Sequence, residues 1–132
     1  MRSYHVNTKD LCCGVTPWER KMIELVLSHV NTLTALGGEV RFQKGHAIFY
    51  EGHLPYGFYV LKKGSVGLSR VTLTGLREDL TNEGKDVFGL FHLLTNTPHC
   101  AMGTAKSDVQ MVFVPKAAVL DFLRKQIKNF SL

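Results

Sequence analysis

The amino-acid sequence predicts a mainly β domain, either a sandwich or a closed barrel of short strands, with one helix at each end. Two observations lead to this prediction. Between residues 39 and 114, short apolar stretches alternate with glycines that recur about every ten residues or fewer, as in strands joined by tight turns. Before and after this region, apolar residues recur at helical spacing instead. The 132 residues fit one domain, which can bury a core without disulfides or a metal.

The first helix is predicted over residues 16–36, after an irregular arm at 1–15 that has no periodic pattern. Thr16 suits the cap position, Pro17 the first helical position and Glu19 the third, which together indicate a helix start. One apolar stripe follows at helical spacing and consists of Met22, Ile23, Val26, Leu27, Val30 and Leu33. Gly37-Gly38 then indicates the end of the helix.

The β region is expected over residues 39–114 and the second helix over 115–130, so that the domain spans 16–132. Strands are predicted at 40–42, 47–50, 58–61 and 65–68, followed by a hairpin that turns at Thr74-Gly75 and by a last strand with alternating Val109, Met111 and Phe113. In the second helix we expect Val119, Leu120, Phe122, Leu123 and Ile127 to face inward. The aromatic residues Trp18, Phe49, Phe58, Tyr59, Phe88 and Phe91 are expected in the core.

Charge and cysteine content indicate where the protein is located and what its surface can bind, and say less about its chemistry. The formal net charge is +5, but basic residues come in pairs such as Lys62-Lys63 and Arg124-Lys125, which indicates a basic surface without a nucleic-acid patch. Three cysteines are too few for a disulfide framework, and we expect a cytoplasmic, reducing location. No signal peptide or membrane-spanning apolar run is present, so no membrane partner is expected.

The segment that indicates a function lies between Asp86 and Ala101. A strand ends at Gly89, residues 91–94 suit a single helical turn, and a proline-containing link leads to the next strand. A glycine before a helix start exposes backbone N–H groups with a partial positive charge, which can hold a phosphate. The candidate ligand-binding residues are Phe88, Gly89, Leu90, Phe91, His92, Pro98, His99, Cys100 and Ala101.

The larger pattern resembles the cyclic-nucleotide-binding domain superfamily, which includes the Crp–Fnr transcription regulators. The resemblance runs from about Thr16 to Ile127 and is carried by Phe42-Gln43-Lys44-Gly45, Ile48-Phe49-Tyr50-Glu51-Gly52, Phe58-Tyr59-Val60-Leu61, Gly64, Gly75, Phe88-Gly89, Ala101 and Ala105. It implies a jelly-roll-like β-barrel (a double-stranded β-helix) with flanking helices. It also implies a small-molecule-sensing (effector) domain that is regulatory in signalling or transcription, with residues 86–101 as its phosphate-binding cassette.

The cassette departs from the family's pattern at the ligand positions. Leu90 stands where family members have a glutamate for the ribose, His99 and Cys100 stand where they have an arginine followed by serine or threonine, and Lys85 replaces a turn glycine. Each lost charge-assisted hydrogen bond costs roughly 1.5–3 kcal/mol, or one to two decades in affinity. Tight binding of cyclic AMP or cyclic GMP is therefore not expected, although the cavity could take a different small anionic ligand. We expect no other cofactor.

The resemblance also sets expectations about partners. In the regulators a long dimerising helix and a helix-turn-helix follow the effector domain, whereas this chain ends at Leu132 without a DNA-recognition helix. It is either a stand-alone sensor or one domain of a longer regulator, and in the second case a homodimer is expected. One alternative is a ligand-free structural or dimerisation module whose interior is plugged by Leu90, Phe91 and Met102.

A second alternative is a redox or haem sensor that uses Cys100 and a histidine. An iron–sulfur cluster needs four thiolates, and the chain has only Cys12, Cys13 and Cys100. The spacing of His46 and His53 does not suit a metal site. An enzyme is not expected, because Glu51 and Asp86 lack a partner for acid–base catalysis and the sequence has no nucleophile motif or P-loop.

Overall fold

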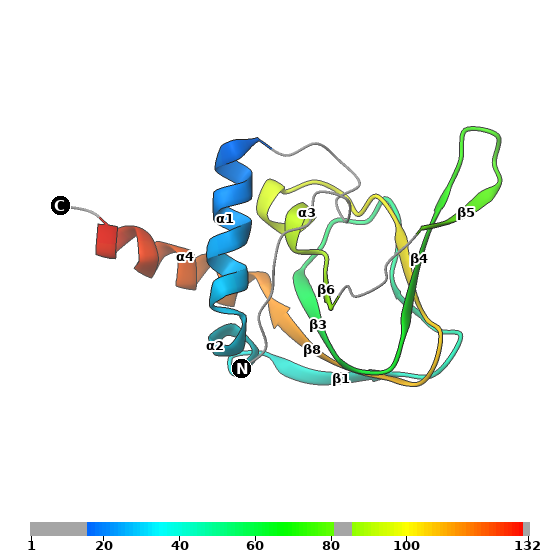
Figure 1. The fold of residues 1–132 in the computed structure, drawn as a ribbon, viewed down its shortest axis with the longest axis horizontal. Helices are drawn as coiled ribbons and strands as arrows, with labels where there is room; N and C mark the ends of the chain where they lie inside the picture. Colours follow the sequence, from blue (N-terminus) through cyan, green and yellow to red (C-terminus); the bar gives the residue numbers. More distant parts are fainter. Residues whose placement is uncertain (1–15, 81–85, 131–132) are drawn as a thin grey trace.

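A computed structural model of the protein describes residues 16–80 and 86–130, the last four of these without their side chains (Figure 1). The expected N-terminal arm at 1–15 and the Lys85 position lie outside the described residues. Eight strands and four helices follow one another in the described part. The helices gather on one side of the strands, and the hairpin of β4 and β5 extends on the opposite side (Figure 1).

The predicted first helix is two helices, α1 (Pro17–Ser28) and α2 (Val30–Thr34). Its start is confirmed, because Glu19 N–H donates to Thr16 Oγ1 at 3.1 Å and Thr16 N–H donates to Glu19 Oε1 at 2.9 Å. The break has a local cause. The Leu25 carbonyl, which a continuous helix would pair with the backbone N–H of His29, instead lies 2.8 Å from Ser28 Oγ and 3.0 Å from His29 Nδ1.

The strands form two antiparallel four-stranded sheets. The first has the order β1-β8-β3-β6 and consists of β1 (Gly38–Phe42), β8 (Val109–Pro115), β3 (Gly57–Lys63) and β6 (Val87–Phe88). The second has the order β2-β7-β4-β5 and consists of β2 (Ala47–Phe49), β7 (Met102–Ala105), β4 (Val66–Val71) and β5 (Arg77–Leu80). The mainly β jelly-roll-like fold is confirmed. Within the described residues the two sheets do not pair with each other, so they are not closed into a barrel.

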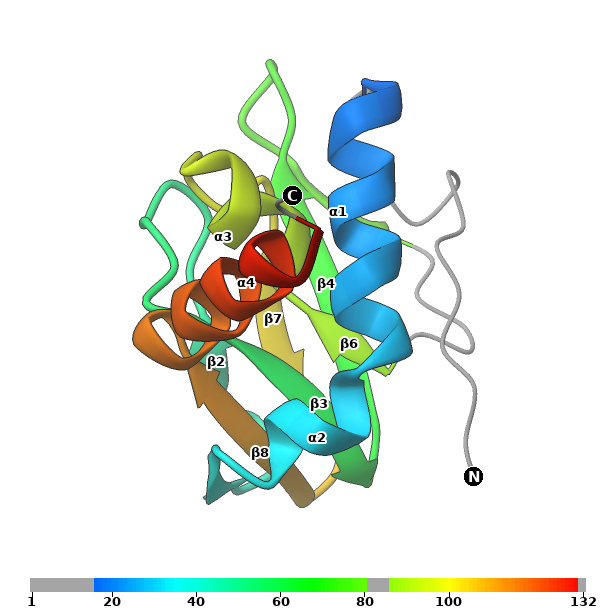
Figure 2. The same ribbon diagram turned by 90° about the vertical axis from the view of Figure 1, so that its left-hand side faces the viewer.

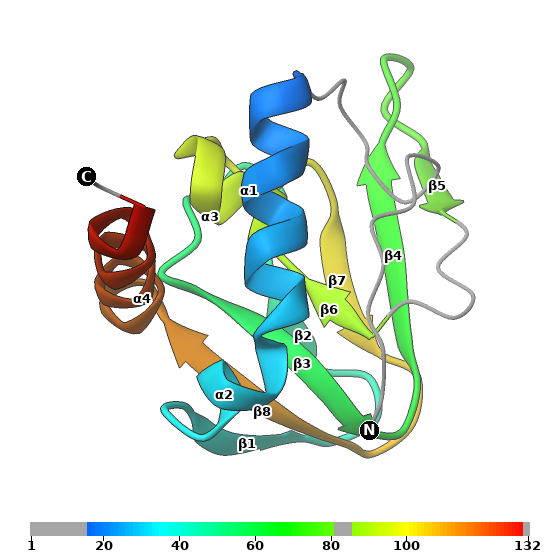
Figure 3. The ribbon, with the colours of Figure 1, turned by 60° about the vertical axis from the view of Figure 1, so that its left-hand side comes forward.

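Helices α1, α3 (Leu90–Thr95) and α4 (Lys116–Phe130) lie on the outer side of the first sheet, in front of β3 and β8 (Figure 2). Figure 3 shows α3 beside the upper half of α1, in agreement with the contacts between them. The first sheet is therefore covered on both faces: by helices on the outside and by the second sheet on the inside.

Two hydrophobic cores result, and β3 contributes to both because its side chains alternate. Phe58 and Val60 are buried among the helices, in a cluster that we call the helix-side core. Tyr59 and Leu61 face the second sheet, in a cluster that we call the inter-sheet core. Each fully buried side chain of this size contributes roughly 1.5–3 kcal/mol.

Three expectations about the helices need correction. Trp18 is 70% exposed, because it lies in the first turn of α1, whose buried face begins only at Ile23. Leu120 is 39% exposed, because the inward face of α4 runs through Val119, Phe122 and Leu123 at helical spacing. α4 begins after Pro115, which is the last residue of β8.

No helix in the described part of the chain is long and apolar enough to cross a membrane.

Candidate functional site

The cassette, residues 86–101, folds as strand β6, helix α3 and a link to β7, as its sequence predicts. Gly89 caps α3 with a φ of 86°, a left-handed conformation that favours glycine. The space beside it is also restricted, because a Cβ on Gly89 would lie 3.1 Å from Cε1 of His99. The imidazole ring of His99 therefore covers Gly89, the position at which the sequence predicts a phosphate.

The apolar cassette residues are divided between the two hydrophobic cores. Leu90 is 4% exposed and lies with Leu93 in the helix-side core, and Phe91 packs against the same cluster. Phe88 lies in the inter-sheet core on the other side of the first sheet. Leu90, at the position of the family's glutamate, thus packs among the helices.

Two histidines of the cassette are buried next to each other. The rings of His92 and His99 are 6.1 Å apart, and His92 Nδ1 lies 2.8 Å from Thr97 Oγ1. Burial, followed by the nearby His92 and His53, lowers the pKa of His99 from 6.5 to about 4. At neutral pH His99 is therefore uncharged and cannot replace the fixed charge of an arginine.

The space beside His99 is filled by Phe49 of β2. The two rings stack at 4.6 Å with an interplanar angle of 24°. Phe49 also lies 6.1 Å from the ring of Tyr59 and 6.3 Å from that of Phe88. The interior next to the cassette is thus occupied by Phe49, and not by Leu90, Phe91 and Met102 as the plugged-module alternative expects.

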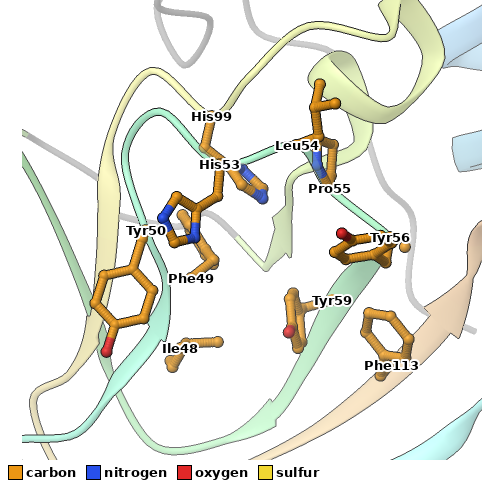
Figure 4. A pocket seen from close by; sticks show the side chains of 11 residues that line it. Ile48, Phe49, Tyr50, His53, Leu54, Pro55, Tyr56, Tyr59, His99 and Phe113 are labelled. Atoms are coloured by element: carbon orange, nitrogen blue, oxygen red, sulfur yellow. The ribbon is translucent and has the colours of Figure 1, made fainter.

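A cavity of about 190 Å³ remains between the sheets, on the side of the Phe49–His99 stack that faces the loop of residues 50–56 (Figure 4). Its lining comes from β2, this loop, β3, β8 and the cassette, and consists of Ile48, Phe49, Tyr50, His53, Leu54, Pro55, Tyr56, Gly57, Tyr59, His99 and Phe113. Of the predicted ligand-binding residues, His99 alone lines it. The other lining residues were not predicted. The sequence does hold a signal for them, since aromatic and histidine residues flank the glycine turn at Tyr50-Glu51-Gly52-His53.

The loop of residues 50–56 is hydrogen-bonded at both ends to elements that a ligand could displace. At one end, Gly52 N–H donates to the His99 carbonyl at 2.8 Å and His99 N–H donates to the His53 carbonyl at 2.9 Å. At the other end, Lys116 N–H, at the start of α4, donates to the Tyr56 carbonyl at 2.8 Å. The loop that lines the cavity is thus bonded both to the cassette and to the start of α4.

The remaining predicted residues do not line the cavity. Pro98 is exposed and Ala101 is buried. Cys100 is disulfide-bonded, whereas Cys12 and Cys13 lie outside the described residues. Disulfides are rare in a reducing cytoplasm, so the cysteines do not support the expected location, which stays a prediction. In the part of the chain that the structure describes, no three His, Cys, Asp or Glu side chains come together as a metal site.

Comparisons with known proteins identify the family and the fold. Residues 39–126 match the family model of the cyclic nucleotide-binding domain. The structure is similar to the catabolite activator protein of Thermus thermophilus, with 24% identity over 86% of this chain and 49% of that chain and a TM-score of 0.66. It is also similar to the sensor domain of the transcriptional regulator DNR from Pseudomonas aeruginosa, with 26% identity over 83% of this chain and 81% of that domain and a TM-score of 0.61.

A third similar structure is the cGMP-bound form of the EAL enzyme Bd1971, with 30% identity over 66% of this chain and 23% of that chain and a TM-score of 0.58. The chain spans less than half the length of three of the proteins that it matches.

Proposed function

Because the chain belongs to the cyclic nucleotide-binding domain family, we propose that it is a regulatory effector domain, in which a small molecule near the cassette changes the packing of α1 and α4. Domains of this family are regulatory modules, and the similarity to the sensor domain of DNR supports the same role here. The wider activities of the longer relatives, including the enzyme Bd1971, concern proteins of which this chain matches only a part.

The observation that carries the proposal is the double contact of the cassette. On one side His99 lines the cavity, and on the other side Leu90 and Leu93 pack in the helix-side core. That core also holds Val26 of α1 and Phe122 of α4. Since only residues 96–98 separate the end of α3 from His99, we expect a ligand that shifts His99 to shift side chains between the helices as well.

The loop of residues 50–56 offers a second connection to α4. Its Tyr56 carbonyl accepts from the first residue of that helix, and Lys116 Nζ also donates to Asn96 Oδ1, at the end of α3, at 3.4 Å. A ligand that moves the loop therefore acts on the same helix as one that moves the cassette. In a longer regulator, α4 would pass the change on to whatever follows it, including the homodimer contact that we propose for that case.

A cyclic nucleotide fits this site less well than the family name suggests. The family's ribose-binding position, Leu90, is buried among the helices, and the neutral His99 ring covers Gly89. A cyclic phosphate would have to displace the Phe49–His99 stack and would then meet no lysine or arginine among the residues that line the cavity. Cyclic nucleotides and other small anions therefore serve as reference compounds in the test.

The test is hydrogen exchange on the intact chain with cyclic AMP, cyclic GMP, cyclic dinucleotides and a set of small neutral aromatic compounds. For any compound that binds, we expect slower exchange in α3 and, beyond the site, in α1 and the start of α4. The proposal is wrong if every bound compound changes exchange in the 50–56 loop alone. Tyr56→Ala serves as the variant with a damaged cavity rim and Leu73→Ala as the matched exposed control.

The second candidate is a structural or dimerisation module without a ligand. The filled space between the sheets favours it, since Phe49 contacts both His99 and Phe88. If no compound in the set binds while the chain forms a concentration-dependent dimer, this candidate replaces the first. A redox role for Cys100 has the disulfide in its favour, and an absorption spectrum of purified protein tests the haem alternative.

A further inference from the structure

We propose that the cavity behind the loop of residues 50–56 binds an uncharged, flat aromatic compound of one or two rings. This inference rests on the proposed effector function and adds the chemical class of its ligand. It concerns the pocket between the loop, β3 and β8, and not the phosphate position at Gly89.

Most of the side chains that line the cavity are aromatic rings. Tyr59 and Phe113 lie 5.1 Å apart on the side of the first sheet, and Phe49 stacks on His99 on the side of the second (Figure 4). Tyr56 lies beside Phe113, and both of these rings line the cavity with Tyr59 and Phe49. Aromatic pairs gain about 0.5–1.5 kcal/mol beyond the burial of their area, so a flat ring gains contacts on several sides that an aliphatic chain would not.

The rim exposes large apolar side chains to water. Tyr56 is 82% exposed, Tyr50 is 51% exposed and Leu54 is 50% exposed, all within one seven-residue loop that surrounds the opening. Exposed apolar groups that gather around a hollow, rather than singly, mark a binding site. A ring that enters the cavity would cover part of this surface.

The charge around the cavity argues against an anion. Among the described residues that line it, none is a lysine, arginine, aspartate or glutamate. The nearest acidic group along the loop, Glu51, accepts from Val71 N–H at 3.1 Å, and the Lys116 ammonium at the other end donates to Asn96. His99 is uncharged at neutral pH because its pKa is lowered to about 4. An anion would thus lose hydration without gaining an opposite charge.

The polar groups that do line the cavity suit neutral hydrogen bonding. The hydroxyls of Tyr56 and Tyr59 and the rings of His53 and His99, which all belong to lining residues, can each donate or accept. They would orient a ring nitrogen, an N–H or a hydroxyl of the ligand. The volume of about 190 Å³ is below the roughly 300–1,000 Å³ of pockets for drug-sized ligands, which limits the occupant to one or two rings.

The test compares matched neutral and anionic compounds by titration calorimetry and by ¹H–¹⁵N NMR on the intact chain. Indole is paired with indole-3-carboxylate and benzyl alcohol with benzoate, and cyclic AMP is added as a nucleotide. We expect the neutral member of each pair to bind about tenfold more tightly or better, with the largest shifts at Gly57, Tyr59, His99 and Phe113. Equal or tighter binding of the anions, shifts that map elsewhere, or no binding at millimolar concentration overturns the proposal.

A variant pair separates the cavity from general surface effects. Tyr56→Ala removes one wall at an exposed position that does not threaten folding, and we expect roughly 2- to 10-fold weaker binding of indole. Leu73→Ala, at a side chain that is fully exposed on the hairpin, should leave binding unchanged. Equal affinities of the two variants would contradict the placement.

The outcome also tells this inference apart from the proposed function. If indole binds at the cavity but exchange in α1 and α4 stays unchanged, the ligand class is right and the effector role is wrong. If cyclic AMP binds and slows exchange in those helices while indole does not bind, the effector role is right and the ligand class is wrong.

Discussion

The ring of Phe49 stacks on the ring of His99 with 4.6 Å between their centroids. Phe49 belongs to the second sheet, and His99 lies near the end of the cassette that crosses from the first sheet. This one contact covers Gly89, fills the space between the sheets and forms a wall of the cavity. The stability of the domain and its choice of ligand therefore depend on the same pair of rings.

Removal of the Phe49 ring should destabilise the domain strongly. Phe49 is 8% exposed, so Phe49→Ala leaves a cavity in the inter-sheet core and should lower the free energy of unfolding by about 3–5 kcal/mol. Urea unfolding measures this value. Leu73→Ala, on an exposed side chain, serves as control and should change it by less than about 0.5 kcal/mol. A loss below about 1 kcal/mol for Phe49→Ala would show that the ring is not packed as described.

Gly103 lies directly against the ring of Phe49. A Cβ at this position would be 2.5 Å from Cε1 and from Cζ of the ring, so Gly103→Ala should cost about 1–3 kcal/mol through overpacking. In a Phe49→Leu background the same substitution should cost less, because the smaller side chain leaves room. A double-mutant cycle by urea unfolding measures the difference. Additive effects of the two changes would contradict the contact.

The stability of the domain should depend on pH through His99. Its pKa is about 4 in the folded state against 6.5 for a free histidine, because burial disfavours the charged ring. Between these values the unfolded chain binds more protons, so the free energy of unfolding is highest above pH 6.5 and falls as the pH decreases towards 4. The largest loss from this one group is about 3 kcal/mol.

Urea unfolding of the wild type and of His99→Gln at several pH values between 4 and 8 measures this dependence. The variant should lose most of the slope between pH 6.5 and 4. His46→Gln, at an exposed histidine, should keep it. Identical slopes for all three proteins would mean that His99 does not titrate as its burial implies.

Restoring the family's acidic residue should harm the fold without creating a ribose site. Leu90 is 4% exposed in the helix-side core, so Leu90→Glu buries a carboxylate among apolar side chains and should cost about 3 kcal/mol or more. Calorimetry should detect no gain in cyclic AMP affinity for the folded fraction. Leu76→Glu, at a side chain that is 71% exposed, is the matched control and should remain as stable as the wild type. A stable Leu90→Glu protein that binds cyclic AMP would show that the cassette can turn this side chain towards a ligand.

The disulfide at Cys100 should contribute measurably to stability. Native disulfides typically stabilise a fold by about 2–4 kcal/mol, so dithiothreitol should lower the melting temperature of the wild type. Cys100→Ser should melt at the lower temperature and should not respond to the reductant. A wild-type melting curve that dithiothreitol leaves unchanged would contradict this prediction.

Much of the fold could be predicted because it depends on local signals. The capping residues Thr16 and Glu19 indicate a helix start by their own hydrogen bonds, and the alternation of Val109 and Met111 indicates a strand with one face in a core. The break at His29 was missed, because it depends on side chains that compete for one carbonyl. Trp18 was misplaced, because its apolar character does not reveal which way the first turn of a helix faces.

The site was predictable only in part. The sequence identifies the cassette and Gly89, because a turn glycine before a helix leaves a local pattern. It does not reveal that the ligand position Leu90 faces the helices, or that Tyr56 and Phe113, which are 57 residues apart, line one cavity.

The sequence alone therefore determined the order of the elements and the family pattern, since both depend on residues that are neighbours along the chain. The tertiary structure alone decided that Phe49 stacks on His99, that the histidine is held uncharged and that aromatic side chains line the cavity beside this pair. These properties arise where two sheets and a loop meet, and burial there sets both the charge of a side chain and the shape of the space beside it.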